Sequence, residues 1–461
     1  MMGVSYFQDL LNSLFERSTE PGAGRADSRS LSEICEALLS ERGEVSGQVL
    51  ACTALERFES LDDAEQIAFF ELFTNEFDID AAQVVEAATN YGEQPSIASF
   101  KRLRTVAEPR RQELLRRLNS APGATHRLVQ MREKLLAAIA SRPELARADQ
   151  DFQHLFASWF NRGFLVMRHI DWQSPASLLE KIIAYEAVHA IHDWDDLRRR
   201  LQPADRRCFA FFHPAMPDEP LIFVEVALLK GKPDSIEQVL ANDREPIDPD
   251  KTDTAIFYSI SNCQNGLKGV SFGNFLIKQV AQDLAEELPQ LKHFMTLSPV
   301  PGLSGWVQSE LNSTSIQGPG VDRDVLVLID KVSKEQLLAP DSATQKAMLG
   351  TVAQYFCQAK RLNGLPVDPV ARFHLGNGAS LDRIIFGADL SPKGIAQSAS
   401  IMVNYRYDLT EVGNRHQAYV SKGEVHTSKA VRALLDEANK NALKKKASSI
   451  ESPSSASQAS E

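Results

Sequence analysis

The chain has 461 residues, which is too long for one ordinary hydrophobic core, because single cores usually stop growing at roughly 250 to 300 residues; the length predicts two domains. Its content of 43% hydrophobic and 24% charged residues is typical of a globular protein and excludes a disordered or fibrous one. The formal net charge of −11 argues against nucleic-acid binding, which normally needs a basic face, but permits an anionic small ligand in a locally positive pocket.

Targeting and redox signals are few. The sequence holds no run of the roughly 18 to 20 apolar residues that would span a bilayer, and MMGVSYFQDLLNSLFERSTE has acidic residues where a secretory signal would be basic. We therefore expect a cytoplasmic protein with no membrane partner. The cysteines are scattered without a C-x-x-C pair, so we expect reduced thiols and no zinc cluster.

Residues 1–190 are predicted to form a helical domain. Segments such as AEQIAFFELFTNEF and HRLVQMREKLLAAIASRPELA repeat apolar residues three and four positions apart, and no convincing strand interrupts them. Turn residues break the pattern at Gly43, Gly123 and Pro143. Since no fixed-period repeat is present, a helical bundle is favoured over a solenoid.

Residues 191–442 are predicted to form a mixed α/β domain. RRCFAFFHP and EPLIFVEVALLKG are short strand-like runs that flank HPAMPDEP, a pattern typical of a β-hairpin. TAIFYSIS is a further strand candidate, the amphipathic FGNFLIKQVAQDLAEEL is a helix, and HFMTLSP is a strand ended by prolines. Residues 443–461 are rich in serine with few large apolar side chains, so we expect a disordered tail.

The segment GLKGVSFGNFLIK allows two functional interpretations. GVSFG matches the G-x-S-x-G nucleophile elbow of serine hydrolases, but an elbow needs a strand that ends directly before the serine, whereas TAIFYSIS ends near Ser261, well before Ser271. The alternative is a strand, a glycine loop and a helix whose first N–H groups bind a diphosphate. A plain turn without a ligand also stays open, because neither the Walker pattern nor G-x-G-x-x-G is present.

Four motifs occur in order along the chain: AIFYSISNCQNGLKGVSFGNFLIKQV, LSPVPG, RFHLGNGA and IMVNYRYDL. Together they resemble the malonyl-CoA decarboxylase family, most strongly over residues 172–408. The resemblance implies an all-helical N-terminal domain, a GNAT-like mixed α/β catalytic domain, and a coenzyme A thioester whose diphosphate lies on the glycine loop. The residues that it assigns to substrate binding are Gly266, Lys268, Gly269, Val270, Ser271, Phe272, Gly273, Asn274 and Tyr407.

The chemistry implied is the conversion of malonyl-CoA to acetyl-CoA and CO2. The thioester carbonyl accepts the electron pair released by decarboxylation, so neither an organic cofactor nor a metal is expected. By resemblance, Ser298 contacts the malonyl carboxylate and His374 donates a proton to the enolate carbon, a task suited to a side chain whose ordinary pKa is near working pH. Some relatives carry glutamate at the position of Ser271, so an acid–base role there is doubtful. Packing of an aromatic strand explains Tyr407 equally well.

The expected ligands are malonyl-CoA and acetyl-CoA, and the resemblance implies a homotetramer, a dimer of dimers, that serves malonate or fatty acid metabolism. Two alternatives stay open besides the serine hydrolase: a GNAT-type acyltransferase that passes the acyl group to an acceptor, and a non-catalytic acyl-CoA sensor. His189 and His192 in VHAIH have the spacing of one helical turn, but without an evident third ligand they favour packing over a metal site.

Overall fold

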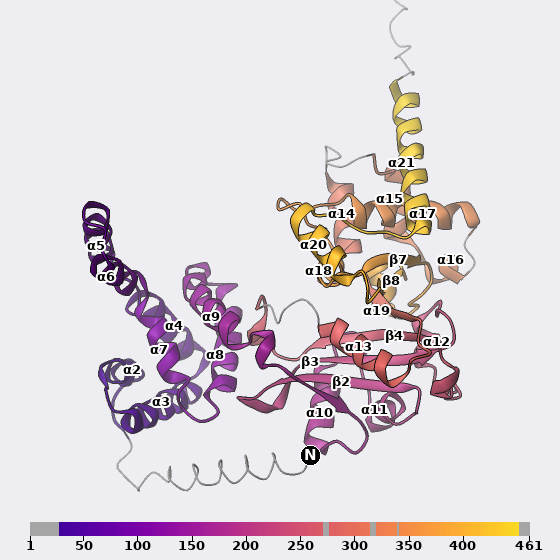
Figure 1. Ribbon diagram of the computed structural model, residues 1–461. Coiled ribbons are helices and arrows are strands. Elements are labelled where there is room, and N and C mark those ends of the chain that lie inside the picture. Colours follow the sequence, from indigo (N-terminus) through magenta and orange to yellow (C-terminus); the bar gives the residue numbers. More distant parts are fainter. Residues whose placement is uncertain (1–26, 271–275, 314–319, 339–340, 451–461) are drawn as a thin grey trace, which may run out of the picture. The chain divides into compact units, whose positions relative to one another are not determined.

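The computed structural model describes residues 27–270, 276–313, 320–338 and 341–450 (Figure 1). The chain divides into two compact units, Met1–Leu155 and Phe156–Glu461, the first helical and the second mixed α/β as predicted. The predicted boundary at residue 190 is wrong. Strand β1 (Val166–Ile170) pairs with β2 (Arg206–His213) and so belongs to the second unit. Its VMRHI sequence lies at the sheet edge, largely exposed, and therefore lacks the apolar alternation that announces a strand.

Helices account for the regular structure described in the first unit. They are α2 (Leu31–Ser40), α3 (Glu44–Glu59), α4 (Asp63–Asn75), α5 (Ala81–Glu93), α6 (Ile97–Ala107), α7 (Arg110–Leu118), α8 (Ala124–Ile139), η1 (Pro143–Leu145) and α9 (Ala146–Trp159), whose last residues enter the second unit. Capping boxes start three of them: Ser30 pairs with Glu33 at α2, Asp62 with Glu65 at α4, and Ser96 with Ser99 at α6. Gly123, predicted as a break, has φ 68° and precedes α8.

The core of the first unit is aromatic. Phe58 lies 5.6 Å from Phe69 and 5.5 Å from Phe70 between ring centroids, and Phe73 lies 6.0 Å from Phe152. These rings come from α3, α4 and α9. Edge and tilted contacts of this kind add roughly 0.5 to 1.5 kcal/mol per pair to the burial of apolar area. Packing between helices therefore holds this unit together.

The second unit is built on one eight-stranded sheet. Its strands are β1, β2, β3 (Met216–Leu229), β4 (Thr254–Asn262), β5 (His293–Thr296), β6 (Ser298–Pro299), β7 (Ser380–Ile385) and β8 (Met402–Tyr407), in the order β1-β2-β3-β4-β5-β8-β6 with β7 also on β8. The predicted β2–β3 hairpin is confirmed, although β3 begins at Met216, inside the predicted turn. β4 and β5 are parallel, and the other pairs are antiparallel.

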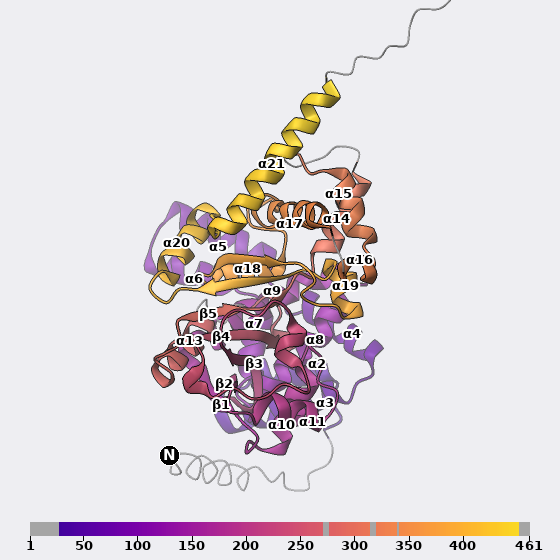
Figure 2. The same ribbon diagram turned by 90° about the vertical axis from the view of Figure 1, so that its right-hand side faces the viewer.

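The second unit also contains helices. They are η2 (Arg162–Phe164), α10 (Ala176–Tyr185), α11 (Trp194–Leu201), α12 (Ile236–Leu240), η3 (Pro249–Lys251), η4 (Asn265–Leu267), α13 (Leu276–Glu287), α14 (Leu303–Asn312), α15 (Arg323–Lys331), α16 (Lys334–Leu338), α17 (Ser342–Cys357), α18 (Pro369–Gly376), α19 (Pro392–Ser398), α20 (Val412–Lys422) and α21 (Lys429–Ile450). Within this unit, α10 and α11 lie beside β3 and β2 (Figure 2), while α17 and α21 contact β7.

The feature of this sheet that matters for function is the parallel pair β4 and β5, which α13 connects. Their register ends at Phe257↔Thr296, and β4 continues to Asn262 without β5 beside it. A parallel pair whose strands separate, with a glycine loop and a helix between them along the chain, is the arrangement expected of the GNAT-like domain predicted above. The carboxyl ends of both strands face the same edge of the sheet.

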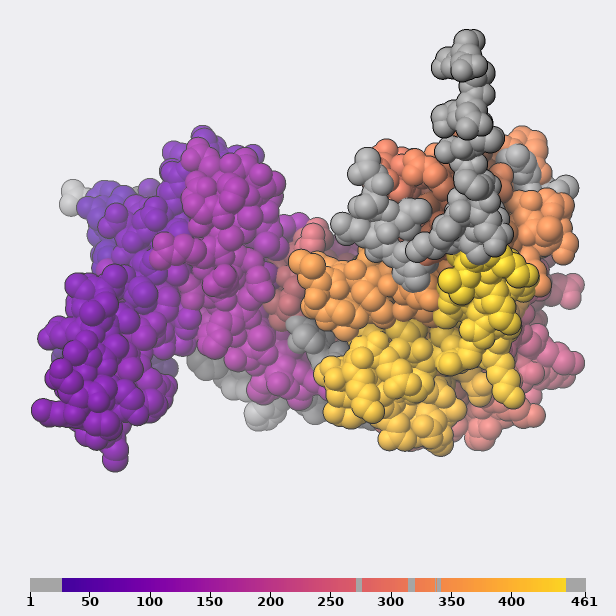
Figure 3. Space-filling view, turned by 90° about the horizontal axis from the view of Figure 1, so that it is seen from above, coloured from indigo at the N-terminus to yellow at the C-terminus, as the bar shows by residue number. Residues whose placement is uncertain are grey.

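The predicted tail is partly wrong. α21 continues through residue 443 to Ile450, and residues 451–461 lie outside the described part of the chain. Its first turns pack on α17, where Gly350 faces Ala438 so closely that an added Cβ would lie 3.0 Å from the alanine Cβ. That packing orders the start of the helix, and the alanines and lysines that continue it are good helix formers. In the space-filling view, α20 and the start of α21 (yellow) form part of the surface of the second unit (Figure 3).

Candidate active site

Three of the predicted residues meet in the second unit. Ser298 begins β6, His374 lies in α18 and Tyr407 ends β8. Ser298 Oγ is 3.2 Å from His374 Nε2, and His374 Nδ1 is 2.8 Å from the Tyr407 hydroxyl. The pairing of Ser298 with His374, which spacing alone could not establish, is therefore present as a continuous hydrogen-bonded row of three side chains.

This row is buried. The relative exposure is 5% for Ser298, 3% for His374 and 2% for Tyr407. The imidazole stacks on the ring of Tyr405 at 4.6 Å between centroids and 23° between planes. A stacked, doubly hydrogen-bonded ring has little freedom to rotate, so the orientation of His374 is fixed before any ligand binds.

Asp368 connects the segments that carry the serine and the histidine. It is the N-cap of α18, where its Oδ1 accepts from the Ala371 N–H at 2.7 Å, and its Oδ2 accepts from the Tyr355 hydroxyl at 3.1 Å. The backbone N–H of Gly302, in the turn that follows Ser298, also bonds this carboxylate. An added Cβ on Gly302 would lie 2.4 Å from the Tyr355 hydroxyl, so this close approach requires glycine.

Burial keeps the side chains of His374 and Tyr407 uncharged. It lowers the pKa of His374 to about 3, and it raises the pKa of Tyr407 well above its usual value. The imidazole and the phenol are therefore both uncharged near pH 7. The expectation that His374 acts because its pKa lies near working pH is wrong for this structure: the ring is neutral because desolvation penalises the imidazolium.

The glycine loop follows β4 at the same sheet edge. Gly266 is buried in η4, Lys268 and Gly269 are exposed, and the Val270 N–H bonds the Leu267 carbonyl at 3.0 Å. Gly269 has φ 81°, a conformation that other residues adopt only with strain. The remaining predicted loop residues lie outside the described chain; they are Ser271, Phe272, Gly273 and Asn274.

One aromatic contact relates β4 to this row of side chains. The Phe257 ring, on β4 at its last pairing with β5, lies 6.3 Å from the Tyr407 ring. The strand that leads into the glycine loop therefore passes directly beside the buried tyrosine. Beyond this contact β4 continues while β5 ends. The loop residues Gly266 and Gly269, which come after β4, therefore lie towards the edge of the sheet at which Ser298 lies.

Sequence reasoning missed two residues that surround this row. Ser298 Oγ donates to Thr296 Oγ1 at 2.8 Å, and the Tyr405 N–H donates to the same oxygen at 3.1 Å. Thr296 and Tyr405 are both fully buried. The available signal was the i, i+2 spacing of Thr296 and Ser298 in MTLSP, since residues two apart on an extended chain point to the same side.

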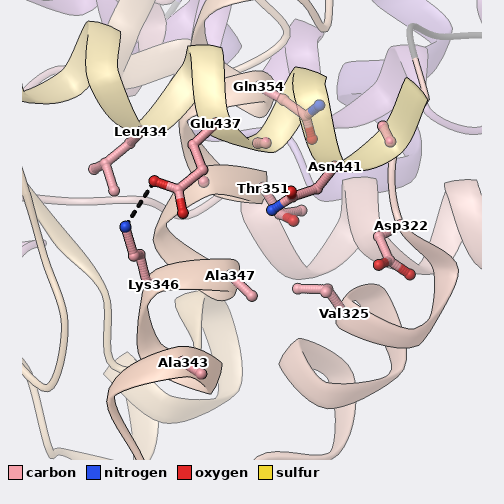
Figure 4. A pocket seen from close by; sticks show the side chains of 13 residues that line it. Asp322, Val325, Ala343, Lys346, Ala347, Thr351, Gln354, Leu434, Glu437 and Asn441 are labelled. Atoms are coloured by element: carbon pink, nitrogen blue, oxygen red, sulfur yellow. Dashed lines mark ion pairs between the residues drawn. The ribbon is translucent and has the colours of Figure 1, made fainter. Parts of the chain in front are cut away.

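Other features of the chain do not contribute to this site. Residues 186–193, which contain His189 and His192, are not helical, so the predicted one-turn spacing is wrong; within the described ranges no three His, Cys, Asp or Glu side chains assemble as metal ligands. A cavity of about 370 Å³ lies between α15, α17 and α21 (Figure 4), where Lys346 and Glu437 form a 2.7 Å ion pair. It holds none of the predicted residues.

No helix in the described part of the chain combines the length and apolar character needed to cross a bilayer.

The fold and the buried row define a class: a two-unit protein whose mixed α/β unit presents serine, histidine and tyrosine where two parallel strands end. The profile of the malonyl-CoA decarboxylase C-terminal domain matches residues 163–445, and that of the N-terminal domain matches residues 77–160. The chain belongs to the malonyl-CoA decarboxylase family.

Individual relatives agree with this assignment. The mitochondrial malonyl-CoA decarboxylase of Anser anser anser is 34% identical over 389 residues, which cover 78% of this chain and 76% of the relative. The Mus musculus enzyme of the same name is 33% identical over 367 residues, 74% of each chain. The crystal structure of malonyl-CoA decarboxylase from Rhodopseudomonas palustris is 49% identical with a TM-score of 0.82 and covers 87% of this chain and 98% of that one. The crystal structure of malonyl-CoA decarboxylase from Agrobacterium vitis is 49% identical with a TM-score of 0.80, and it covers 88% of this chain and 99% of that one.

Proposed function

We propose that this protein is a carboxy-lyase that converts malonyl-CoA to acetyl-CoA and CO2. The observation that carries the proposal is the buried row of Ser298, His374 and Tyr407, with its contacts of 3.2 and 2.8 Å, at the end of the parallel pair β4 and β5. Such a row supplies what the reaction needs from a protein: a proton for carbon at a place from which bulk water is excluded.

In this reaction the thioester of the substrate itself accepts the electrons that decarboxylation releases. As the bond between the α-carbon and the carboxylate breaks, its electron pair moves into the thioester carbonyl and CO2 leaves. The resulting enolate must be stabilised and then protonated at carbon. His374 lies within hydrogen-bond distance of Ser298, the residue assigned to the malonyl carboxylate, and it is the group we assign to protonation. A positioned proton donor contributes about a hundredfold to ten-thousandfold.

The nucleotide end of the substrate is assigned to the glycine loop. Lys268 and Gly269 are exposed and follow β4, whose last pair with β5 is Phe257 opposite Thr296. The loop and the catalytic row therefore lie at the same edge of the sheet. Glycine permits the backbone to approach a diphosphate closely, and the first N–H groups of the helix that follows favour negative charge. This assignment includes Ser271, Phe272, Gly273 and Asn274, which the described residues do not reach.

The test is turnover without an acceptor. The purified full chain is incubated with malonyl-CoA alone, and CO2 release and acetyl-CoA formation are measured together. Equal amounts of both products are expected. A requirement for an added amine or alcohol would favour the GNAT-type acyltransferase, and binding of malonyl-CoA without any product would favour the acyl-CoA sensor. Covalent labelling of Ser271 by a fluorophosphonate would favour the serine hydrolase.

We infer a homotetramer, assembled as a dimer of dimers, in which the helical unit provides contacts. The α5–α6 hairpin supports this inference. Val85 is 67% exposed, Ile97 77% and Phe100 47%, although all three are large and apolar. Exposed apolar surface of this kind favours a protein partner. Light scattering of the parent and of a Val85→Lys, Ile97→Lys double variant tests it: the variant should dissociate, and an unchanged mass would exclude this face from the assembly.

We place the protein in the cytoplasm, in malonate or fatty acid metabolism. The proposed thioester substrate supports this role. Fractionation of the producing cells, with malonyl-CoA levels measured with and without the protein, tests both. Recovery in a membrane or organelle fraction, or unchanged malonyl-CoA, would contradict them.

A further inference from the structure

The hydroxyl of Thr296 occupies an unusual place beside the catalytic row. It is fully buried, and its Oγ1 accepts two hydrogen bonds, from Ser298 Oγ–H at 2.8 Å and from the Tyr405 N–H at 3.1 Å. The Thr296 carbonyl in turn accepts from Asn404 Nδ2 at 2.7 Å. Backbone and side chain are thus both tied to β8, so the oxygen that receives the serine proton is held in place.

Counting protons then fixes the direction of each hydrogen bond. A serine hydroxyl has one proton, and here Ser298 donates it to Thr296. The 3.2 Å contact between Ser298 Oγ and His374 Nε2 therefore needs an N–H on the imidazole. A neutral imidazole has a single N–H, so Nδ1 carries none and accepts from the Tyr407 hydroxyl at 2.8 Å. The row then runs in one direction, from Tyr407 through His374 and Ser298 to Thr296.

We propose that Thr296 is a positioning residue that turns the Ser298 hydroxyl proton away from His374 and thereby keeps the imidazole proton on Nε2, the nitrogen nearest to Ser298. This proposal rests on the decarboxylase function proposed above. The enolate carbon takes the Nε2 proton, the electron pair of that N–H bond stays on the ring, and Nδ1 accepts the proton of the Tyr407 hydroxyl. To complete the cycle, Nδ1 returns that proton to the phenolate and water protonates Nε2.

The direction of this hydrogen-bonded row also opposes nucleophilic attack by Ser298. A serine becomes a nucleophile when its proton is taken by a histidine nitrogen that lacks one. In this row, Nε2 of His374 donates to Ser298 and cannot take its proton. Thr296 thus directs the site towards proton donation to carbon and away from an acyl-enzyme.

The tautomer of His374 can be measured directly. In full-length protein with 15N-labelled histidine rings, a nitrogen that carries a proton and one that does not have well-separated chemical shifts, and the His374 signals are identified by their loss in His374→Gln. We expect the parent to show the proton on Nε2. A parent whose proton is on Nδ1 overturns the proposal without any variant of Thr296.

Two variants of Thr296 separate positioning from structure. Thr296→Val keeps the shape but removes the acceptor, so the Ser298 proton should turn to His374, the ring should shift to the other tautomer, and kcat should fall about tenfold with little change in KM. Thr296→Ser keeps the hydroxyl and should restore most of kcat and the parent tautomer. A Thr296→Val protein with parent tautomer and kcat, or a Thr296→Ser protein as slow as the valine variant, overturns the proposal.

These outcomes are distinct from failure of the proposed function. If the parent releases no CO2 from malonyl-CoA, the decarboxylase assignment fails, whereas the tautomer of the parent still reports on Thr296. If the parent releases CO2 and its ring proton is on Nδ1, the decarboxylase assignment stands and the role of Thr296 fails.

Discussion

The buried ion pairs of the helical unit and the buried catalytic row of the mixed α/β unit treat charge in opposite ways. In the helical unit two buried arginines are paired with carboxylates: Arg132, 1% exposed at its side chain, bonds Asp149 at 2.7 Å, and Arg111 bonds Asp78 at 2.9 Å. Arg111 also pairs with Asp151. In the mixed α/β unit the buried row of Ser298, His374 and Tyr407 carries no charge near pH 7, because burial holds the histidine and tyrosine in their neutral forms.

The difference shows what each unit can do. An arginine that is already paired with carboxylates has its charge compensated, and it serves to fix the helices that carry it. A neutral row can move protons without first breaking an ion pair, so it can respond to charge that develops on a bound thioester. In a low-dielectric site such charge is weakly screened. Breaking each kind of polar contact should therefore change different properties, stability in one unit and turnover in the other.

The largest effect is expected from His374→Ala. Removing the group assigned to carbon protonation should lower kcat about a hundredfold to ten-thousandfold. The circular dichroism spectrum and the affinity for malonyl-CoA should change little, because the loop residues assigned to the nucleotide are untouched. Full turnover by a correctly folded variant would remove His374 from the mechanism. His416→Ala is the matched control, since that side chain bonds a backbone carbonyl and lies outside the row.

Next in size is the effect of Arg132→Leu. It leaves Asp149 buried without its guanidinium partner, so the free energy of unfolding should fall by about 3 to 5 kcal/mol. Arg142→Leu is the matched control: that arginine pairs with Glu71 at 2.7 Å but both side chains are largely exposed, and the loss should be about 0 to 1 kcal/mol. Denaturant unfolding measures both. The kcat per folded molecule should equal that of the parent in each, and a selective loss of kcat would contradict the division of roles.

Much of this comparison could be predicted from the sequence, and some could not. The family resemblance predicts Ser298, His374 and Tyr407, and periodicity predicts the helical and mixed units, because long amphipathic helices and strand–loop–helix patterns are local signals. The contacts between them depend on how β5, α18 and β8 pack, which no local pattern encodes. The role of Thr296 could not be predicted, because a threonine in a strand usually contributes only to packing. Strand β1 was missed because an exposed edge strand has no apolar pattern.

The neutral state of His374 could not be predicted for a related reason. Its sequence context, Phe373 and Leu375, suggests a core position but does not say how completely water is excluded. The pKa fell to about 3 because α18, β8 and the Ser298 turn together enclose the ring. Sequence identifies the residue, whereas its electrostatics belong to the assembled unit.

A smaller effect is expected from Tyr407→Phe. Loss of the hydroxyl removes the 2.8 Å partner of Nδ1 and the group assigned to return a proton to the ring. We expect kcat to fall about tenfold, and the free energy of unfolding to fall by about 1 to 3 kcal/mol, because Nδ1 stays buried without its hydrogen-bond donor. Tyr419→Phe is the matched control, because its buried hydroxyl has no hydrogen-bond partner in the described residues. Equal rates for the two variants would show that the hydroxyl of Tyr407 does not contribute to turnover.

The smallest effect concerns pH. The pKa of His374 is lowered from 6.5 to about 3, so the ring stays neutral from pH 8 down to pH 5, and kcat should show no loss that reports its titration in that range. Stability should behave differently. The unfolded chain protonates this histidine near pH 6.5 and the folded protein does so only near pH 3, so its contribution to folding is fully present above 6.5 and is lost as pH falls towards 3. Unfolding of His374→Gln should therefore depend on pH less steeply over this window, by up to about one proton. Identical slopes for parent and variant would mean that His374 is as solvated as in the unfolded chain, and the neutral row on which the comparison depends would be lost.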